Sequence, residues 1–248
     1  MTDIINITLL ALLGSVIALL GGIVFLYNKK LSAVLEKYSV SFAAGVLVTV
    51  SLIGLLPEAV HILGENAFWV MTITFLSVFL FEHVFFGIHH HDDEHHVRGK
   101  EFSTFFVIVG DTIHNFIDGI AIAVTYFVSP GLGFVTALST FLHEVPHEIA
   151  DFGILLKSGW SKKRIIIINL ISASMTIVGA LLVYFYNDNT ILNGTLMAVS
   201  AGIFLYLGAS DFLPKIETEG KNKFKSILPL VLGVVAMMLT FKLIPHGH

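Results

Sequence analysis

The sequence predicts an all-α membrane protein, a bundle of eight transmembrane helices. Hydrophobic residues make up 55% of its 248 residues and charged residues only 13%. The mean hydropathy is +0.86. Apolar runs of about twenty residues, long enough to cross a bilayer as a helix, recur along the chain. The net charge of -4 is small and no basic patch is present, so we expect membrane lipid and no nucleic acid among the partners.

Polar residues and helix breakers bound each apolar run, which places the helices in order along the chain. The first run has full membrane length and lacks a basic leading region, so we expect a retained helix rather than a cleaved signal. The sequence contains no cysteine, which removes disulfides and thiolate metal ligands. The predicted helices cover residues 7–27, 39–60, 67–88, 102–128, 131–157, 164–187, 191–213 and 226–244.

Basic residues test this helix count because they fall in alternate connections. Thirteen of the fourteen lie in the first, third, fifth and seventh connections, and only Lys242 lies elsewhere. The positive-inside rule then places those connections in the cytoplasm and both termini on the opposite side. Most connections are short, so we expect a single integral domain over residues 1–248, in the plasma (inner) membrane.

Two polar strings interrupt the apolar fourth and fifth helices: His114-Asn115-Phe116-Ile117-Asp118 and His143-Glu144-Val145-Pro146-His147-Glu148. Four-residue spacing puts the histidine and aspartate of the first string on one helix face. In the second string the same spacing puts the two histidines on one face and the two glutamates on an adjoining face. At about 1.5 Å per residue both strings lie roughly 20 Å into the membrane. Ionisable groups are costly there, and mixed imidazole and carboxylate ligands suit divalent transition metals, so the strings predict a metal site. The alternative is plain hydrogen bonding between helices.

Pro146 lies inside the second string. It has no backbone N–H to donate and leaves the carbonyl of Leu142 without its helical partner, so we expect a kink at this level. Irregular helix at membrane depth is tolerated where it lines a cavity, and transporters place their sites in such segments.

Further ionisable residues lie on either side of the two strings. Asp111, Asp151 and Asp211 are expected toward the cytoplasm, where they form an acidic path or else cap helices and pair with lysines. Glu58 and His61 lie at the outer end of the second helix, where they either gather cations or are ordinary interfacial residues.

The third connection, at about residues 89–100, is rich in histidine and acid. Such a segment cannot pack a core but binds zinc-like ions weakly, so it either receives or senses the ion or is an inert tether. Its candidate ligands are His89, His90, His91, His95 and His96.

At its two polar strings the chain resembles the ZIP family (Zrt- and Irt-like proteins) of zinc and iron transporters, above all the branch with a His-Glu-x-Pro-His-Glu signature on the fifth helix. The eight helices, the outer termini, the histidine-rich third connection and the segment Asp211-Phe212-Leu213-Pro214 also fit. The resemblance implies homodimers and an alternating-access motion of one helix bundle against another.

The resemblance also implies a paired-metal site. Ligands of a first metal would be His114, Asp118, His143 and His147, and ligands of a second Asn115, Asp118, Glu144 and His147. Glu148 ends the signature and joins the candidate ligands. Some family members place a further carboxylate on the sixth helix, whereas this chain offers only Asn169, Ser172 and Ser174 there.

These observations predict a transporter that moves a divalent metal ion toward the cytoplasm. Zinc is the expected cargo, Fe²⁺, Mn²⁺ and Cd²⁺ are further candidates since ligand type does not separate them, and no organic cofactor is expected. One alternative is an intramembrane metalloprotease, because residues 143–147 satisfy H-E-x-x-H. Pro146 and the second ligand pair, His114 and Asp118, argue against it. A metal sensor that moves no ion is the other alternative, and the acidic path argues against that.

Overall fold

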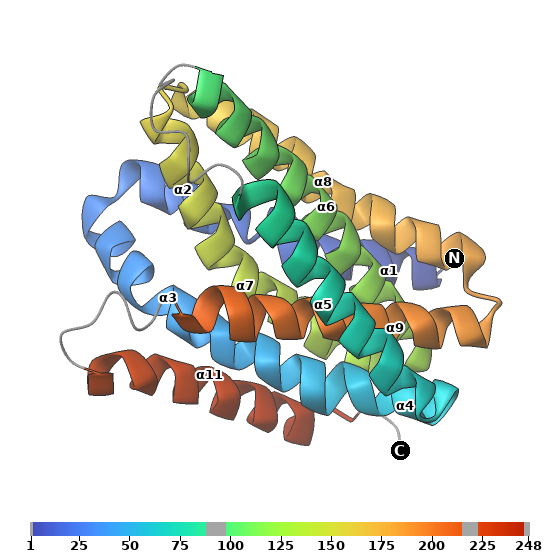
Figure 1. Ribbon diagram of the computed structural model, residues 1–248. Helices are drawn as coiled ribbons and strands as arrows, with labels where there is room; N and C mark the ends of the chain where they lie inside the picture. Colours follow the sequence, from blue (N-terminus) through green and yellow to red (C-terminus); the bar gives the residue numbers. More distant parts are fainter. Residues whose placement is uncertain (1, 88–97, 215–222, 246–248) are drawn as a thin grey trace.

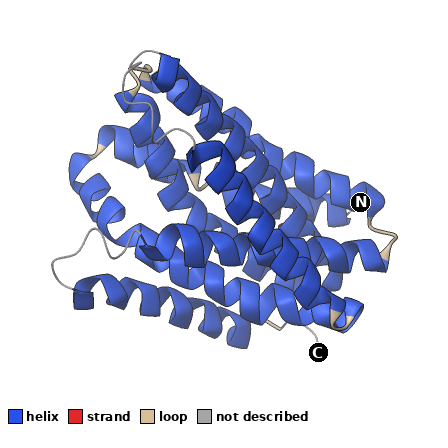
Figure 2. Cartoon of the chain, viewed as in Figure 1, coloured by secondary structure: helices blue, strands red, loops and turns tan. Residues whose placement is uncertain are grey.

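The computed structural model describes residues 2–87, 98–214 and 223–245, and every regular element in these ranges is a helix (Figure 1 and Figure 2). The predicted all-α class is confirmed. The five histidines of the third connection lie outside the described residues, and residues 98–100 of that connection already belong to a helix.

The described ranges contain eight helical passes, in the order predicted. Five are single helices or nearly so, and three change helix type part-way. The first pass is α1 (Thr2–Ala11), η1 (Leu12–Val16) and α2 (Leu19–Tyr27), and the second is α3 (Lys29–Thr49), η2 (Val50–Leu55) and α4 (Leu56–Leu63). The others are α5 (Asn66–Gly87), α6 (Arg98–Val128), α7 (Pro130–Lys157), α8 (Lys162–Tyr186), α9 (Thr190–Tyr206) with η4 (Leu207–Phe212), and α11 (Lys223–Leu243).

The second pass begins at Lys29, well before the predicted start at residue 39. Asn28 caps this helix, since its side-chain oxygen accepts a hydrogen bond from the N–H of Leu31 at 3.2 Å. Hydropathy locates only the apolar part of a helix, whereas the backbone here stays helical through the polar residues before it.

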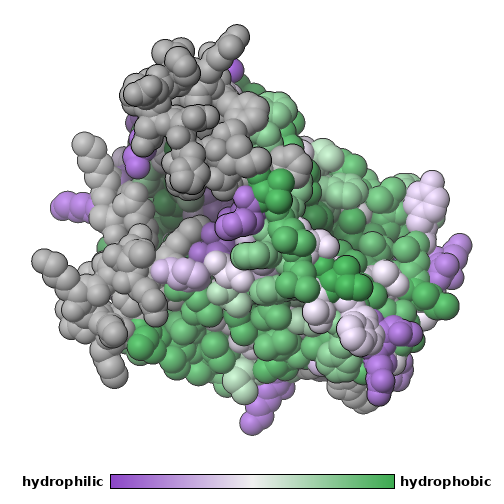
Figure 3. All heavy atoms as spheres, in the orientation of Figure 1, coloured by the Kyte–Doolittle hydropathy of each residue, from purple (hydrophilic) through white to green (hydrophobic). Residues whose placement is uncertain are grey.

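Six helical stretches of the described chain are long and apolar enough to cross a membrane. α7 is 28 residues long but carries several ionisable side chains, and the apolar part of α11, Ile227–Leu243, is shorter than these six. Hydrophobic residues cover most of the visible face, with hydrophilic ones mainly toward its edges (Figure 3). On α5 even Trp69 is 69% exposed and Ile73 61% exposed, as expected for side chains that face lipid.

Each of the three π-helical segments contains one glycine and one serine. In η1 these are Gly14 and Ser15, and η2 and η4 follow the same composition. Both residue types weaken regular α-helix. Two of the serines use the irregular backbone to reach a neighbouring helix: Ser15 donates to the carbonyl of Ala173 at 3.1 Å and Ser51 to that of Ala201 at 2.7 Å. The segments therefore fix how the passes pack.

Glycines let α6 and α8 pack with their backbones in contact. A Cβ on Gly119 would collide with the carbonyl of Thr176, and one on Gly179 would collide with the carbonyl of Phe116. Small residues at such crossings are typical of membrane helices. α6 also packs against α7, and His114 and Asp118 of the first polar string face that helix.

Candidate metal centre

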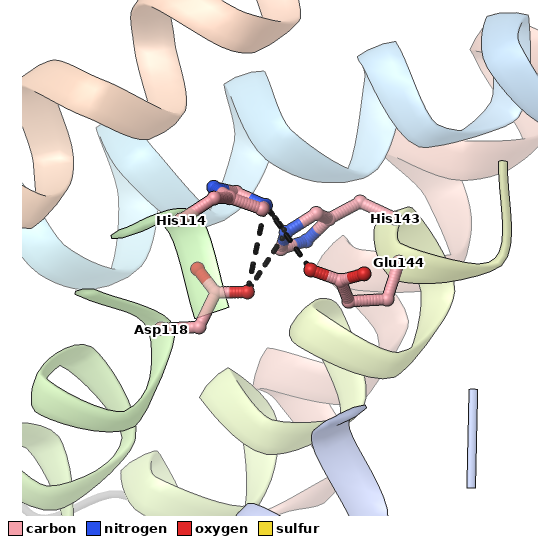
Figure 4. Close-up of side chains that lie close together, drawn as sticks. All are labelled: His114, Asp118, His143 and Glu144. Atoms are coloured by element: carbon pink, nitrogen blue, oxygen red, sulfur yellow. Dashed lines mark hydrogen bonds and ion pairs between the residues drawn. The ribbon is translucent and has the colours of Figure 1, made fainter. Parts of the chain in front are cut away.

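Four side chains converge between α6 and α7, near the middle of both helices. His114 and Asp118 extend from α6, and His143 and Glu144 extend from α7, so that all four point toward one another (Figure 4). One nitrogen or oxygen atom from each lies within 4.8 Å of the other three. The depth and pairing expected from the sequence thus bring two strings, 25 residues apart along the chain, into one cluster.

The separations of these atoms are those of ligands around one small cation. Nε2 of His114 lies 3.2 Å from Oε1 of Glu144 and 3.7 Å from Oδ2 of Asp118. Nε2 of His143 lies 3.2 Å from Oδ2 of Asp118 and 3.2 Å from Nε2 of His114. Zinc binds nitrogen and oxygen at about 2.0–2.1 Å, which in a tetrahedron sets ligand atoms about 3.3 Å apart. These four distances lie near that value, and all four donor atoms lie within 4.8 Å of one another.

The ring of His143 is oriented for metal binding. Its Nδ1 lies 2.9 Å from the carbonyl oxygen of Ser139, one turn earlier on α7. Since a carbonyl only accepts hydrogen bonds, Nδ1 carries the proton and Nε2 presents its lone pair to the cluster. The acceptor is a backbone carbonyl, which lies four residues before any helical histidine, so the identity of Ser139 carries no signal for this role.

The cluster is almost sealed from solvent. The side chains of His143 and Asp118 are fully buried, Glu144 is 1% exposed and His114 is 11% exposed. Two carboxylates in such a place require a cation or protons, because burying an uncompensated charge is costly. The geometry and burial together fit a dehydrated divalent ion held by two imidazoles and two carboxylates.

His147 lies beside the cluster rather than in it. Its ring centroid is 4.8 Å from that of His114, but none of its atoms belongs to the four-atom group. Aromatic rings of the seventh pass cover this side: Phe204 of α9 lies 5.4 Å from the ring of His143, and Phe212 of η4 lies 4.8 Å from the ring of His147. Neither phenylalanine could have been assigned here from the sequence, which does not say which pass faces the site.

Asn115 lies in a hydrogen-bond network on another side of α6. Its Oδ1 accepts from the hydroxyls of Ser15 and of Thr176, the latter at 3.0 Å, and its Nδ2 donates to the carboxylate of Asp111 at 2.9 Å. An amide oxygen has two lone pairs, and both are used. The network joins η1, α6 and α8, and neither Ser15 nor Thr176 was a sequence-derived candidate.

The remaining candidates on α7, Glu148 and Asp151, lie beyond the cluster toward the C-terminal end of the helix. Glu148 is buried with 2% exposure, and it is close enough to Asp111, Glu144 and Asp151 to interact electrostatically. Asp151 lies a further turn along and is half-buried. α7 is helical without interruption through Pro146, so the proline does not end the helix.

The last three candidates, Asp211, Glu58 and His61, also lie outside the four-residue cluster. Asp211 occupies η4, next to the Phe212 ring that covers His147. Glu58 is buried on α4 and His61 is exposed a turn later, and neither belongs to the metal-ligating group found among the described residues.

Comparison with known proteins bears on this arrangement. A family model described as ZIP zinc transporter matches residues 89–240, more than half of the chain and both polar strings. The chain belongs to the ZIP zinc transporter family. Similar proteins include the zinc transporter foi of Drosophila melanogaster, 35% identical over 136 residues, and zinc transporter ZIP10 of Homo sapiens, 41% identical over 128 residues. The zinc transporter zipt-7.2 of Caenorhabditis elegans is 33% identical over 140 residues.

These ZIP relatives are much longer than the matched segment. The alignments cover 54%, 50% and 53% of this chain, but only 19%, 15% and 30% of the three relatives. The chain therefore matches less than a third of the length of these relatives.

Proposed function

We propose that this chain transports zinc across a membrane, with the ion held at mid-membrane by His114, Asp118, His143 and Glu144. The observation that carries the proposal is the convergence of four donor atoms within 4.8 Å of one another, with four of their separations at 3.2–3.7 Å, near the spacing around a tetrahedral zinc ion. Membership of the zinc transporter family and the names of the similar proteins support the same cargo. The donors suit borderline metals, so we also propose Fe²⁺, Mn²⁺ and Cd²⁺ as competing cargo, with no organic cofactor.

We assign roles to the flanking residues by their place. His147 lies against His114 and is positioned to take over the ion when the cluster rearranges. Asp111, Glu148, Asp151 and Asp211 would line the way to the cytoplasm, and Glu58 with His61 the outer entrance. Asn115 we assign to positioning α6 rather than to a second metal, because protein hydroxyls use both lone pairs of its oxygen.

For the ion to pass through the protein, the aromatic rings that cover the metal cluster must move. The rings of Phe204 and Phe212 lie on the seventh pass, while the four ligands lie on α6 and α7. The contact between them is made by side chains and can separate more readily than the backbone contact of α6 with α8. We infer an alternating-access motion in which the seventh pass and its neighbours shift against α6 and α7.

Zinc flux into liposomes tests the transport proposal. Purified protein would be reconstituted with a zinc-sensitive dye inside the vesicles, and we expect zinc-dependent signal above that of protein-free vesicles. Asp118→Ala should abolish it, whereas Asp188→Asn, an exposed carboxylate far from the cluster in sequence, should leave it unchanged. Vesicles that gain no zinc, or an Asp118→Ala variant as active as the parent protein, would contradict the proposal.

The same preparation separates transport from proteolysis. Glu144 would activate water in a metalloprotease but ligates the cargo here, where its Oε1 lies 3.2 Å from His114. We expect no cleavage of membrane-peptide substrates by the parent protein. Cleavage that disappears in Glu144→Gln would favour the protease.

We further infer that the chain is one integral domain of the plasma (inner) membrane, a homodimer of the His-Glu-x-Pro-His-Glu branch, with both termini outside and zinc moving inward. The absence of native cysteine makes orientation testable. Asp188→Cys should react with an impermeant maleimide in intact cells, and Lys163→Cys only after the membrane is opened. The reverse pattern would overturn the orientation. Cross-linking in native membranes tests the dimer.

A further inference from the structure

The antiparallel register of α6 and α7 extends beyond the four-residue cluster. Asp118 of α6 lies opposite His143 of α7, and His114 lies opposite Glu144. Moving one turn back along α6 and one turn forward along α7 reaches Asp111 and Glu148, because both offsets are three or four residues. The two carboxylates therefore occupy the next level of the same helix pair.

Glu148 is a buried carboxylate that lacks, in the part of the chain that the structure describes, a partner to offset its charge, as expected of a residue that binds a metal ion. It is 2% exposed, and neither carboxylate oxygen has a hydrogen-bond partner among the described residues. Buried carboxylates are normally hydrogen-bonded or paired with a cation. Asp111 and Glu144, the groups within electrostatic reach on its inner side, are also acids, so they repel rather than compensate its charge.

Asp111 is held in place on the opposite helix. Nδ2 of Asn115 donates to its Oδ1 at 2.9 Å, and the hydroxyl of Ser172 on α8 also hydrogen-bonds this half-buried carboxylate. A carboxylate oxygen has more than one lone pair, so both bonds leave it able to contact a cation. Asn115 is itself anchored by Ser15 and Thr176. The hydrogen-bond network thus orients the carboxylate of Asp111 at the level of Glu148.

We propose that Asp111 and Glu148 form a second cation site made only of oxygen ligands, one helical turn from the first. It rests on the proposed function, and it differs from a paired-metal centre built on Asn115. Glu144 is a ligand of the first site and lies within electrostatic reach of both Asp111 and Glu148, so it can pass the ion on. Water would complete the ligand set, as is usual where only two carboxylates contact a divalent ion.

The two sites have different chemistry. The first offers two imidazoles and two carboxylates, which favour zinc over harder cations, whereas the second offers oxygen alone. Zinc should consequently bind more weakly at the second site. An ion that leaves the first site would then meet a looser one on the side where basic connections predict the cytoplasm.

Binding stoichiometry tests the second site. The full chain, with the five histidines at 89–96 replaced by serine so that they bind no metal, would be placed in lipid nanodiscs and dialysed against ⁶⁵Zn²⁺. We expect two zinc ions per chain, the weaker one lost in Glu148→Gln. The affinity for the remaining ion should change less than threefold. Asp188→Asn is the matched control and should retain both.

Cadmium NMR gives a second readout, which reports the type of ligand at each site as well as the number of bound ions. ¹¹³Cd²⁺ bound to the same protein should give two signals, one typical of mixed nitrogen and oxygen ligands and one typical of oxygen alone. Only the latter should vanish in Glu148→Gln. A single ion lost in His143→Ala but kept in Glu148→Gln would overturn the second site and leave the proposed function standing. No bound ion at all would overturn the proposed function itself.

Discussion

Asp118 and Asn115 lie close together on α6 and both are fully buried, yet their side chains differ in whether they are hydrogen-bonded by the protein. Asn115 has its oxygen bonded to two hydroxyls and its nitrogen bonded to Asp111. The two oxygens of Asp118 have no hydrogen-bond donor among the described residues, and Oδ2 lies against the imidazoles of His114 and His143 instead. The satisfied amide serves the fold, whereas a buried carboxylate without a hydrogen-bond donor is suited to bind a cation that offsets its charge.

This difference has an energetic consequence. A carboxylate buried without a partner destabilises the metal-free protein, whereas a satisfied amide contributes to its stability. Substitutions in the two regions should therefore separate zinc affinity from resistance to unfolding. The predictions below use that separation, from the largest expected effect to the smallest.

Asp118→Asn should produce the largest change, and it should affect binding alone. The substitution keeps the shape but removes the charge, so we expect zinc affinity to fall by about 100-fold or more, beyond the loss typical of residues that only support ligands. The metal-free protein should unfold at the same temperature or higher, since a buried charge is gone. Equilibrium dialysis and thermal unfolding in detergent measure the two effects. An unchanged zinc affinity together with a lowered stability would mean that Asp118, like Asn115, serves the fold rather than zinc binding.

Asn115→Ala should do the opposite. Thr176 and Asp111 lose a hydrogen-bond partner, and Ser15 keeps only the carbonyl of Ala173, so we expect a loss of about 3 kcal/mol in the free energy of unfolding. Zinc affinity at the first site should change less than about tenfold. Denaturant unfolding and dialysis provide the measurements.

Asn169→Ala is the matched control for that variant. Asn169 is also a buried asparagine, but among the described residues its side chain donates to the carbonyl of Ile165 on its own helix, at 2.9 Å. We expect about 1 kcal/mol of destabilisation there. Equal losses in the two variants would mean that the network around Asn115 has no special role.

The fold could be predicted from the sequence almost completely, since crossing a bilayer demands long apolar helices and the basic residues mark alternate connections. The polar extension of α3 before residue 39 was missed, because hydropathy does not register a helix that continues beyond the apolar region. The π-helical segments were missed as well. Their glycines and serines are visible in the sequence, but they look the same as residues that only permit close packing.

For the site, the spacing of the residues was enough to predict that the two strings meet, but not which residues of the second string contribute to the four-atom group. Glu144 joins the four-atom group and His147 lies beside it, whereas the family resemblance implied the reverse for a first metal. Which of two adjacent faces of α7 turns toward α6 depends on the rotation of the helix, and packing sets that rotation. Phe204 and Phe212 belong to a distant pass, so only the tertiary fold reveals them.

Gly179→Ala should lower both the stability of the protein and its zinc affinity. Its effect is therefore intermediate between those of Asp118→Asn and Asn115→Ala. The added Cβ would meet the carbonyl of Phe116, a backbone atom next to Asn115 that cannot move aside without shifting α6. We expect a loss of about 2 kcal/mol, typical of overpacking, and a several-fold weaker zinc affinity. Gly110→Ala, also on α6, has nothing within 4 Å and should be neutral or slightly stabilising. A harmless Gly179→Ala would mean that α8 does not set the position of the site.

Thr176→Val should have the smallest effect. The substitution keeps the shape and removes one of the two hydroxyls that donate to Asn115, so we expect a loss of about 1 kcal/mol and no change in zinc affinity. If the hydroxyl acts only through Asn115, adding Thr176→Val to Asn115→Ala should cost nothing further, because the partner is already gone. Additive losses in this double-mutant cycle, measured by denaturant unfolding, would show that Thr176 stabilises α8 independently. The satisfied network would then be two separate contacts rather than one unit.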